Sequence, residues 1–401
     1  MILQLQIYLA IGAIITSIAI TYRHALHRSG RYAVIDIGLW WLAFLALYSI
    51  QPILIWLFTG QFESAATDRL EVLATTEADV AQILTLSAFY AIAFMVAYAI
   101  TVRSSGARKP VPIANIDNIV FVVTAILFVT LWILLKTVFP DLNTGSGYES
   151  KFLTLSESSL GLRRTHKLFL TFLVPCGIIL VVGIMQRRGV RPLAILSIPA
   201  LVLMANPGGS RGVAFLVILA FLISWHALVR PIPRKIWLLL AVCGILAFNL
   251  LGAIRSYGHF PNPSELLPWL LSSGEFEHIF GNAVELLHAV QREALHIPLT
   301  IRFSELFAFV PSELLIFDKT ALPDWFMDNF YPELKAAGGG LAFGVTAQAI
   351  VGHGSIEAMV RGLIFGVVLG KVYQLLYRHA RHWWVFPVYI YLLTRIFDSV
   401  R

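Results

Sequence analysis

This chain of 401 residues has few charged side chains and only two cysteines. Charged residues make up 13% of the chain, hydrophobic residues make up 58%, and the mean hydropathy is +0.77. Soluble globular domains carry about 25% charged residues, so this composition excludes an ordinary soluble protein. Cys176 and Cys243 both lie inside apolar runs, which excludes a disulfide framework and suggests no metal site. The composition therefore predicts a polytopic membrane protein.

The sequence also lacks a cleavable signal peptide, an internal repeat of fixed period and any spacing typical of metal ligands. The opening stretch ILQLQIYLAIGAIITSIAIT has no basic region and no small-residue cleavage site, so we interpret it as the first membrane span. The net charge of +7 comes from basic residues in short loops between apolar runs. The positive-inside rule explains this distribution, and no nucleic-acid partner is indicated.

Ten apolar segments are candidates to cross the membrane, which requires about 20 residues for about 30 Å of hydrocarbon. The loops HRSGR, VRSSGARK, QRRGVR, RPIPRK and RHARH are basic, whereas residues 60–80 are acidic. The basic loops therefore predict the cytoplasmic side, with both chain ends on the opposite side. The ten expected spans are residues 2–22, 33–58, 81–101, 118–138, 168–186, 192–206, 212–229, 236–254, 356–377 and 383–398.

The pattern divides the chain into a transmembrane helix bundle (1–254), a non-cytoplasmic helical loop (255–340) and C-terminal transmembrane helices (341–401). We expect an all-α membrane protein with about 10–12 transmembrane helices. Amphipathic patterns and prolines in the loop predict several short helices. A helix over residues 341–377 would be about 55 Å long, so we expect it to break near Gly352–Gly354, after a short first helix.

The stretch NPGGSRG at residues 206–212 is predicted to be a tight turn on the non-cytoplasmic side. Ser210 is a good N-cap for the helix that follows, and Arg211 stands beside the free N–H groups of that helix start. Such a helix start favours an anion at the height of lipid phosphates. The alternative is that Arg211 is an interfacial arginine whose charge reaches the headgroups.

Further cations map to the non-cytoplasmic side, against the usual charge bias. Arg255 closes a predicted span, where a cation also suits the helix C-terminus. Arg361 lies inside an apolar run, and an intramembrane arginine is costly unless it is paired or binds a ligand. Glu357, one helical turn earlier, is its candidate partner, so a salt bridge and a ligand site both stay open for Arg361.

Motifs in the second half resemble the Wzy-type O-antigen and capsular polysaccharide polymerases. The resemblance rests on GGSRG opening a span, IRSYG closing the next, PSELLIFDKTALPDWF in the large loop, GGGLAFGVTAQAIVGHGSIE entering a span, and LLTRIF near the end. It covers residues 200–401 best. Gln348 stands where the family often has a glutamate, and Gly352 and His353 stand where an Asn-aromatic pair is common.

The resemblance implies a GT-C-like glycosyltransferase in the bacterial inner membrane, with its active site facing the periplasm. Its donor and acceptor would be undecaprenyl-diphosphate-linked oligosaccharides, with no cofactor or metal. Expected partners are membrane lipid and a chain-length regulator and flippase of the same pathway. The acceptor hydroxyl needs a base, and the loop offers His259, Glu265, Glu275, Glu277, His278, Asp318 and Glu333, of which we expect Glu277, Asp318 and Glu333 to be catalytic. The cations expected to bind the diphosphate are Arg211, Arg255, Lys319, Arg361 and Arg395, and the residues expected to contact sugar are Ser210, Tyr257, Gln348 and His353.

Two alternatives stay open. O-antigen ligases share the same plan of spans and the Ser-Arg-Gly turn, although this chain lacks a clear histidine-asparagine entry to the late span. A flippase or transporter of the same lipids would place polar residues near the membrane midplane, whereas the charged groups here cluster toward the span ends. His288 and His296 fall on an amphipathic pattern that favours packing or interfacial roles.

Overall fold

The structure, a computed structural model, describes residues 2–59, 75–103, 113–139, 160–190, 211–257, 275–292, 297–302, 320–336 and 341–400. These residues form helices, with no strand among them. Five of the helices are long and apolar enough to cross a membrane, which agrees with an α-helical membrane protein. They are Ile2–Ser29, Glu77–Arg103, Asn118–Val138, Leu168–Gln186 and Ser355–His379.

The helices follow the order expected from the apolar runs. In chain order they are α1 (Ile2–Ser29), the 3-10 helix η1 (Gly30–Ile35), α2 (Ile37–Thr59), α3 (Glu77–Arg103), α4 (Asn118–Val138), α6 (Leu160–Gln186), α8 (Arg211–Leu228), α9 (Arg234–Tyr257), α11 (Glu275–Arg292), α12 (Leu299–Arg302), α13 (Leu322–Phe330), α14 (Pro332–Ala336), α15 (Ala347–Ile350), α16 (Ser355–His379) and α17 (Val385–Val400). Nine of the ten predicted spans coincide with helices of this set. The tenth, 192–206, lies outside the described residues.

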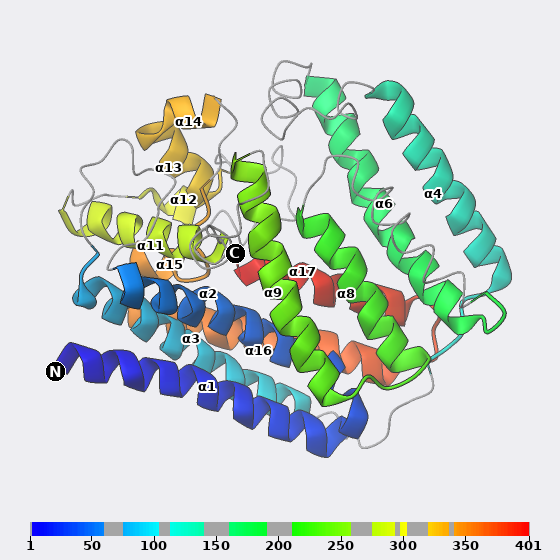
Figure 1. Ribbon diagram of the computed structural model, residues 1–401, viewed down its shortest axis with the longest axis horizontal. Coiled ribbons are helices and arrows are strands. Elements are labelled where there is room, and N and C mark those ends of the chain that lie inside the picture. Colours follow the sequence, from blue (N-terminus) through cyan, green and yellow to red (C-terminus); the bar gives the residue numbers. More distant parts are fainter. Residues whose placement is uncertain are drawn as a thin grey trace.

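The helix ends next to the basic loops meet in one region, which we call the basic end. There the N–H of Ala114 donates to the carbonyl of Ala380 (3.0 Å). The side chain of Gln186 accepts from the N–H of Ile116 (2.8 Å) and donates to the carbonyl of Ala114 (2.9 Å). Figure 1 shows α1, α4, α6, α8, α9 and α16 converging at the lower right and spreading apart toward the opposite side. From α1 to α6 the long helices alternate in direction, and α8 again runs toward the basic end while α9 runs away from it.

The closest helix pair is α3 and α16, which run parallel in direct backbone contact. Gly362, Gly366 and Gly370 recur every four residues on one face of α16. A Cβ at Gly366 would lie 2.5 Å from the carbonyl oxygen of Phe94 and 2.9 Å from the Cβ of Ala97. Small residues at this spacing let two membrane helices approach closely, so this stripe fixes α16 against α3.

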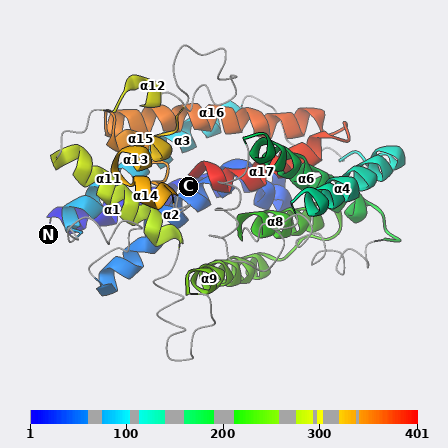
Figure 2. The ribbon, with the colours of Figure 1, turned by 90° about the horizontal axis from the view of Figure 1, so that it is seen from above.

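The helices α11 to α15 gather at the other end of α1, α2, α3 and α16, and we call them the cap (Figure 2). One face of α11 is buried, and its Phe276 ring packs edge-on against Tyr48 of α2 at 4.8 Å. Asn282 of α11 donates to the carbonyl of Ala342 (3.0 Å), and the N–H of Val345 donates to the carbonyl of Val400 (3.1 Å). The predicted short helices within 255–340 are therefore present, and they pack back onto the long helices.

The predicted break before the late span is confirmed. The short helix α15 ends at Ile350, and α16 begins at Ser355 after Gly354, whose φ of 57° is rare for residues with a Cβ. This turn places the N-terminus of α16 beside α15, in the cap.

Candidate functional site

Three charged side chains meet at the N-terminus of α16. Glu357 accepts from Nε of Arg361 through Oε1 at 3.1 Å, one helical turn along the same helix. Its other oxygen, Oε2, accepts from Nη2 of Arg302 in α12. The side chains of Arg302, Glu357 and Arg361 are 12%, 10% and 15% exposed, so all three are largely buried. We call this group the arginine cluster.

The turn between α15 and α16 completes the cluster. The backbone N–H of His353 donates to Oε2 of Glu357 at 3.1 Å. Gly352 lies so close that a Cβ there would be 1.9 Å from Oε2 of Glu357 and 2.3 Å from Nη2 of Arg302. A residue with a side chain at position 352 would therefore push the ion pair apart, and glycine is required for this geometry.

Two guanidinium groups contact one carboxylate in the cluster, and the dipole of α16 adds positive potential at its N-terminus. The i to i+4 pair of Glu357 and Arg361 also stabilises the helix. Such a group of donors suits an anion with several oxygens, because arginine forms planar paired hydrogen bonds with phosphate.

The cluster answers the question that the sequence left open for Arg361. Its predicted i to i+4 partner is present, so the salt bridge to Glu357 exists, and Arg302 joins it from the cap. Of the residues predicted to contact sugar, His353 lies in the turn that carries the cluster and Gln348 lies in α15 just before it. His353 is exposed, whereas Gln348 is buried in α15.

Three other predicted site residues lie elsewhere in the described structure. Glu277, proposed as a catalytic acid or base, is only 2% exposed in α11, so its carboxyl group does not face solvent in this conformation. Glu333 is exposed on α14. The guanidinium carbon of Arg395 in α17 lies 5.5 Å from the ring centroid of Tyr391.

The remaining predicted residues fall where the structure describes no side chain. Ser210, Asp318 and Lys319 lie outside the described residues. Arg211 begins α8 as expected for the turn NPGGSRG, but its side chain, like those of Arg255 and Tyr257 in the last turns of α9, is not described. Their proposed roles stay predictions.

A second polar group in the cap joins α11 to α3. Nε2 of His288 lies 3.0 Å from Oδ1 of Asp79, and Oδ2 of Asp79 accepts from the N–H and the hydroxyl of Thr76 at 2.8 and 2.7 Å. A packing or interfacial role was expected for His288, and its side chain is 11% exposed. The contact ties the C-terminal part of α11 to the start of α3.

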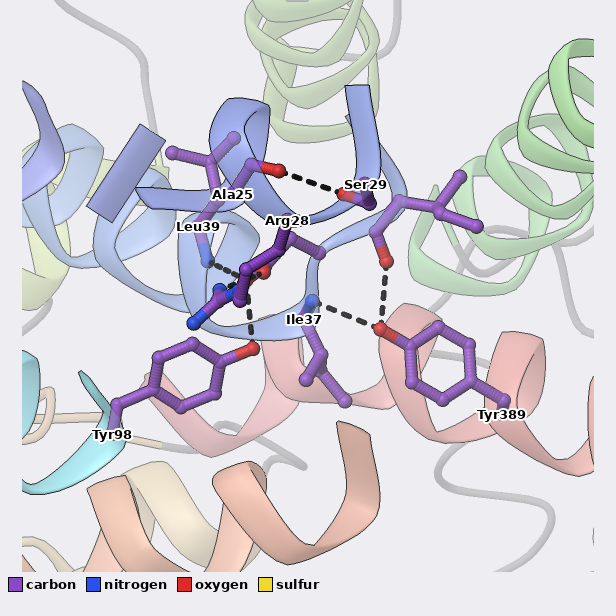
Figure 3. A network of polar contacts seen from close by, with 9 residues as sticks. Ala25, Arg28, Ser29, Ile37, Leu39, Tyr98 and Tyr389 are labelled. Atoms are coloured by element: carbon purple, nitrogen blue, oxygen red, sulfur yellow. Dashed lines mark hydrogen bonds and ion pairs between the residues drawn. The ribbon is translucent and has the colours of Figure 1, made fainter. Parts of the chain in front are cut away.

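The sequence analysis gave no role to the most deeply buried charge in the described structure. Asp36, between η1 and α2, is fully buried and accepts from Nη2 of Arg28 (3.0 Å), the hydroxyl of Tyr98 (2.8 Å) and the N–H of Leu39 (3.1 Å). Figure 3 shows that these groups come from α1, α2 and α3 and surround the carboxylate. The sequence places Asp36 inside the predicted span 33–58, and a charged residue inside a membrane span needs a partner. This position could have identified Asp36 as a residue of interest.

The same network reaches α16 and α17. The hydroxyl of Tyr389 donates to the carbonyl of Ile35 (2.7 Å) and accepts from the N–H of Ile37 (3.0 Å). The guanidinium carbon of Arg28 lies 5.3 Å from the ring centroid of Tyr373. Asp36 therefore holds five helices together at the basic end, which gives it a structural role.

Among the described residues, no group of three or more His, Cys, Asp or Glu side chains is placed to hold a metal ion. The arginine cluster is thus the group of charged side chains that best fits an anionic ligand. It combines the predicted Arg361 with Arg302, which the sequence did not single out as a site residue. No known protein family, curated protein or solved structure matches this chain.

Proposed function

We propose that this protein is a GT-C-like membrane glycosyltransferase that polymerises undecaprenyl-diphosphate-linked oligosaccharide repeats into a surface polysaccharide. The observation that carries the proposal is the arginine cluster, which joins α12 of the cap to the first turns of the membrane-spanning α16. The cap end is, in this proposal, the periplasmic side of the bacterial inner membrane, because the basic loops gather at the other end.

The chemistry requires cations at this height in the membrane. As the glycosidic bond to the lipid diphosphate breaks, negative charge develops on the leaving phosphate, and fixed donors that stabilise this charge lower the barrier. Arg302 and Arg361 supply such donors at the start of α16. The rest of the diphosphate and the neighbouring lipids are proposed to be bound by Arg211, Arg255, Lys319 and Arg395.

The acceptor sugar must also lose a proton from its attacking hydroxyl group. Exposed Glu333 is a candidate base, as are Glu277 and Asp318 in the same part of the sequence. The sugars are proposed to be oriented by Ser210, Tyr257, Gln348 and His353. Of these residues, His353 is bound to the cluster directly, through the hydrogen bond from its N–H to Glu357.

The proposal is tested with purified protein in detergent micelles. Polymerisation requires only the donor, the acceptor and the binding pocket, and no intact membrane. Lipid-linked repeats should therefore give a ladder of longer lipid-linked glycans. The ladder should also form with a chelator present, because arginines rather than a divalent ion offset the charge of the leaving diphosphate. Recovery of unchanged single repeats with folded protein would reject the polymerase.

A flippase of the same lipids is the second candidate function, and it would place polar residues near the membrane midplane. A flippase causes no chemical change in a lipid-linked repeat, so the micelle assay separates the two functions. Transfer of a fluorescent lipid-linked sugar across a liposome bilayer, without elongation, would instead support the flippase.

A further inference from the structure

The exposed face of α16 is apolar along most of its length and cationic near its end. The glycines that pack against α3 leave another face of the helix exposed, and this face carries Val360, Ile364 and Val367. Lys371 and Arg378 continue the same face, because successive members of the set are three, four or seven positions apart. Both cationic side chains are exposed. We call these five residues the α16 strip.

The α16 strip faces the lipid, since α16 is long and apolar enough to cross a membrane. Trp384, in the connection from α16 to α17, is 40% exposed, and exposed tryptophan is typical of the membrane–water interface. Arg378 lies near this level. Lys371 lies about 10 Å closer to the membrane centre along the helix axis, at a rise of about 1.5 Å per residue.

No acidic side chain among the described residues pairs with Lys371 or Arg378. A charge within a membrane span is costly unless it is paired or reaches the headgroups. A lysine side chain is long enough to reach toward the interface. In a helix, however, each Cα–Cβ bond is tilted toward the N-terminus, so Lys371 starts out directed away from the basic end. An anion that approaches from the lipid would provide the missing partner.

We propose that the α16 strip binds an anionic phospholipid, with its phosphate at Lys371 and Arg378 and its acyl chains along Val360, Ile364 and Val367. Such a lipid is charged at one end and apolar along the rest, as the strip is. A zwitterionic lipid such as phosphatidylcholine carries a cation beside its phosphate, and the two protein cations repel that cation. A second copy of this chain packed through the same strip would bring like charges together.

This site lies at the basic end of α16, whereas the arginine cluster lies at its other end, in the cap. The inference does not rest on the proposed function, because it requires only that α16 contacts lipid.

The test measures lipid binding to the full-length protein in a nonionic detergent, by native mass spectrometry with phosphatidylglycerol and phosphatidylcholine as probes. Phosphatidylglycerol should bind more tightly, and salt should reduce this preference. Lys371→Gln combined with Arg378→Gln should weaken phosphatidylglycerol binding by about 30-fold, because two attractive charges are lost. Lys371→Arg keeps the charge and should bind as the unaltered protein does.

The matched control is Arg230→Gln combined with Lys235→Gln, which removes the same charge from exposed residues of the basic end. Lys235 lies in α9, and Figure 2 shows α9 on the other side of the molecule from α16. This variant should bind phosphatidylglycerol with unchanged affinity.

Unchanged phosphatidylglycerol affinity in the folded variant of Lys371 and Arg378, or an equal loss in the control, would overturn the proposal. The two cations would then only reach the headgroups in general. A change in oligomeric state in place of lipid loss would also reject it, since the strip would then be an interface between copies. If the double variant does not fold, Lys371→Met suits the lipid-facing position and should show a smaller loss of the same kind.

Discussion

The hydroxyl of Tyr98 donates a hydrogen bond of 2.8 Å to Oδ1 of the fully buried Asp36. The contact joins the C-terminal part of α3 to the connection between α1 and α2. Gly38, one residue after Ile37, makes it possible, because a Cβ at Gly38 would lie 2.5 Å from the tyrosine ring. The basic end is therefore organised around one carboxylate and the tyrosine that packs against it.

Removal of this carboxylate should destabilise the protein strongly. In Asp36→Ala the guanidinium group of Arg28 is left without its ion-pair partner, and loss of one partner of a buried pair costs about 3–5 kcal/mol. Tyr98→Phe removes only one hydrogen bond to a charged group, with an expected cost of about 1.5–3 kcal/mol. Thermal unfolding in detergent measures both effects. Tyr8→Phe, at a residue 70% exposed, is the control and should unfold as the unaltered protein does.

The glycine stripe predicts a second difference in stability. Gly366→Ala places a methyl group 2.5 Å from the carbonyl oxygen of Phe94, so α16 must move away from α3, at a cost of about 1–3 kcal/mol. Gly12→Ala makes the same change in α1, where no atom lies within 4 Å of the added Cβ. That variant should be stabilised by up to about 1 kcal/mol, because alanine favours helix. Equal unfolding temperatures for the two variants would contradict the close approach of α3 and α16.

The arrangement of helix ends predicts which side of the membrane each loop occupies. Cys176 and Cys243 are first replaced, and single cysteines are then introduced for exposed Asn329 in the cap and exposed Arg381 at the basic end. An impermeant thiol reagent added to intact spheroplasts should label Asn329→Cys. Arg381→Cys should react only after the membrane is opened. Labelling with the opposite pattern would reverse the orientation and remove the basis for a periplasmic site.

The arginine cluster predicts a loss of catalysis with little loss of expression. Arg302→Ala and Arg361→Ala each remove a donor proposed to stabilise the leaving diphosphate, and elongation of lipid-linked repeats should slow by about 10²-fold or more. Arg361→Lys should stay impaired, because lysine cannot offer two parallel hydrogen bonds. Arg230→Ala, at an exposed residue of the basic end, should elongate normally. Full activity in both cluster variants would show that these arginines serve only the structure.

The helices and their order could be predicted from the sequence alone. Length and hydropathy of an apolar run are local properties, so nine of ten predicted spans coincide with helices, and the break before Ser355 follows from glycines and from length. The ion pair of Glu357 and Arg361 was also within reach, because residues four apart share one face of a helix. The positions of these helices along the chain needed no knowledge of their packing.

Which charged residues contact one another across helices depends on the tertiary packing and could not be predicted from the sequence. Arg302 and Glu357 are 55 residues apart in the chain, and Asp36 and Tyr98 are 62 apart, so no helical period relates them. Their contacts depend on where the cap folds back and on how closely α3 and α16 approach, and both are set by packing along the whole length of these helices. A charge inside an apolar run can be recognised in the sequence as energetically costly. Its partner depends on the fold, because a buried charge is stabilised by whichever opposite charge the packing brings within hydrogen-bond distance.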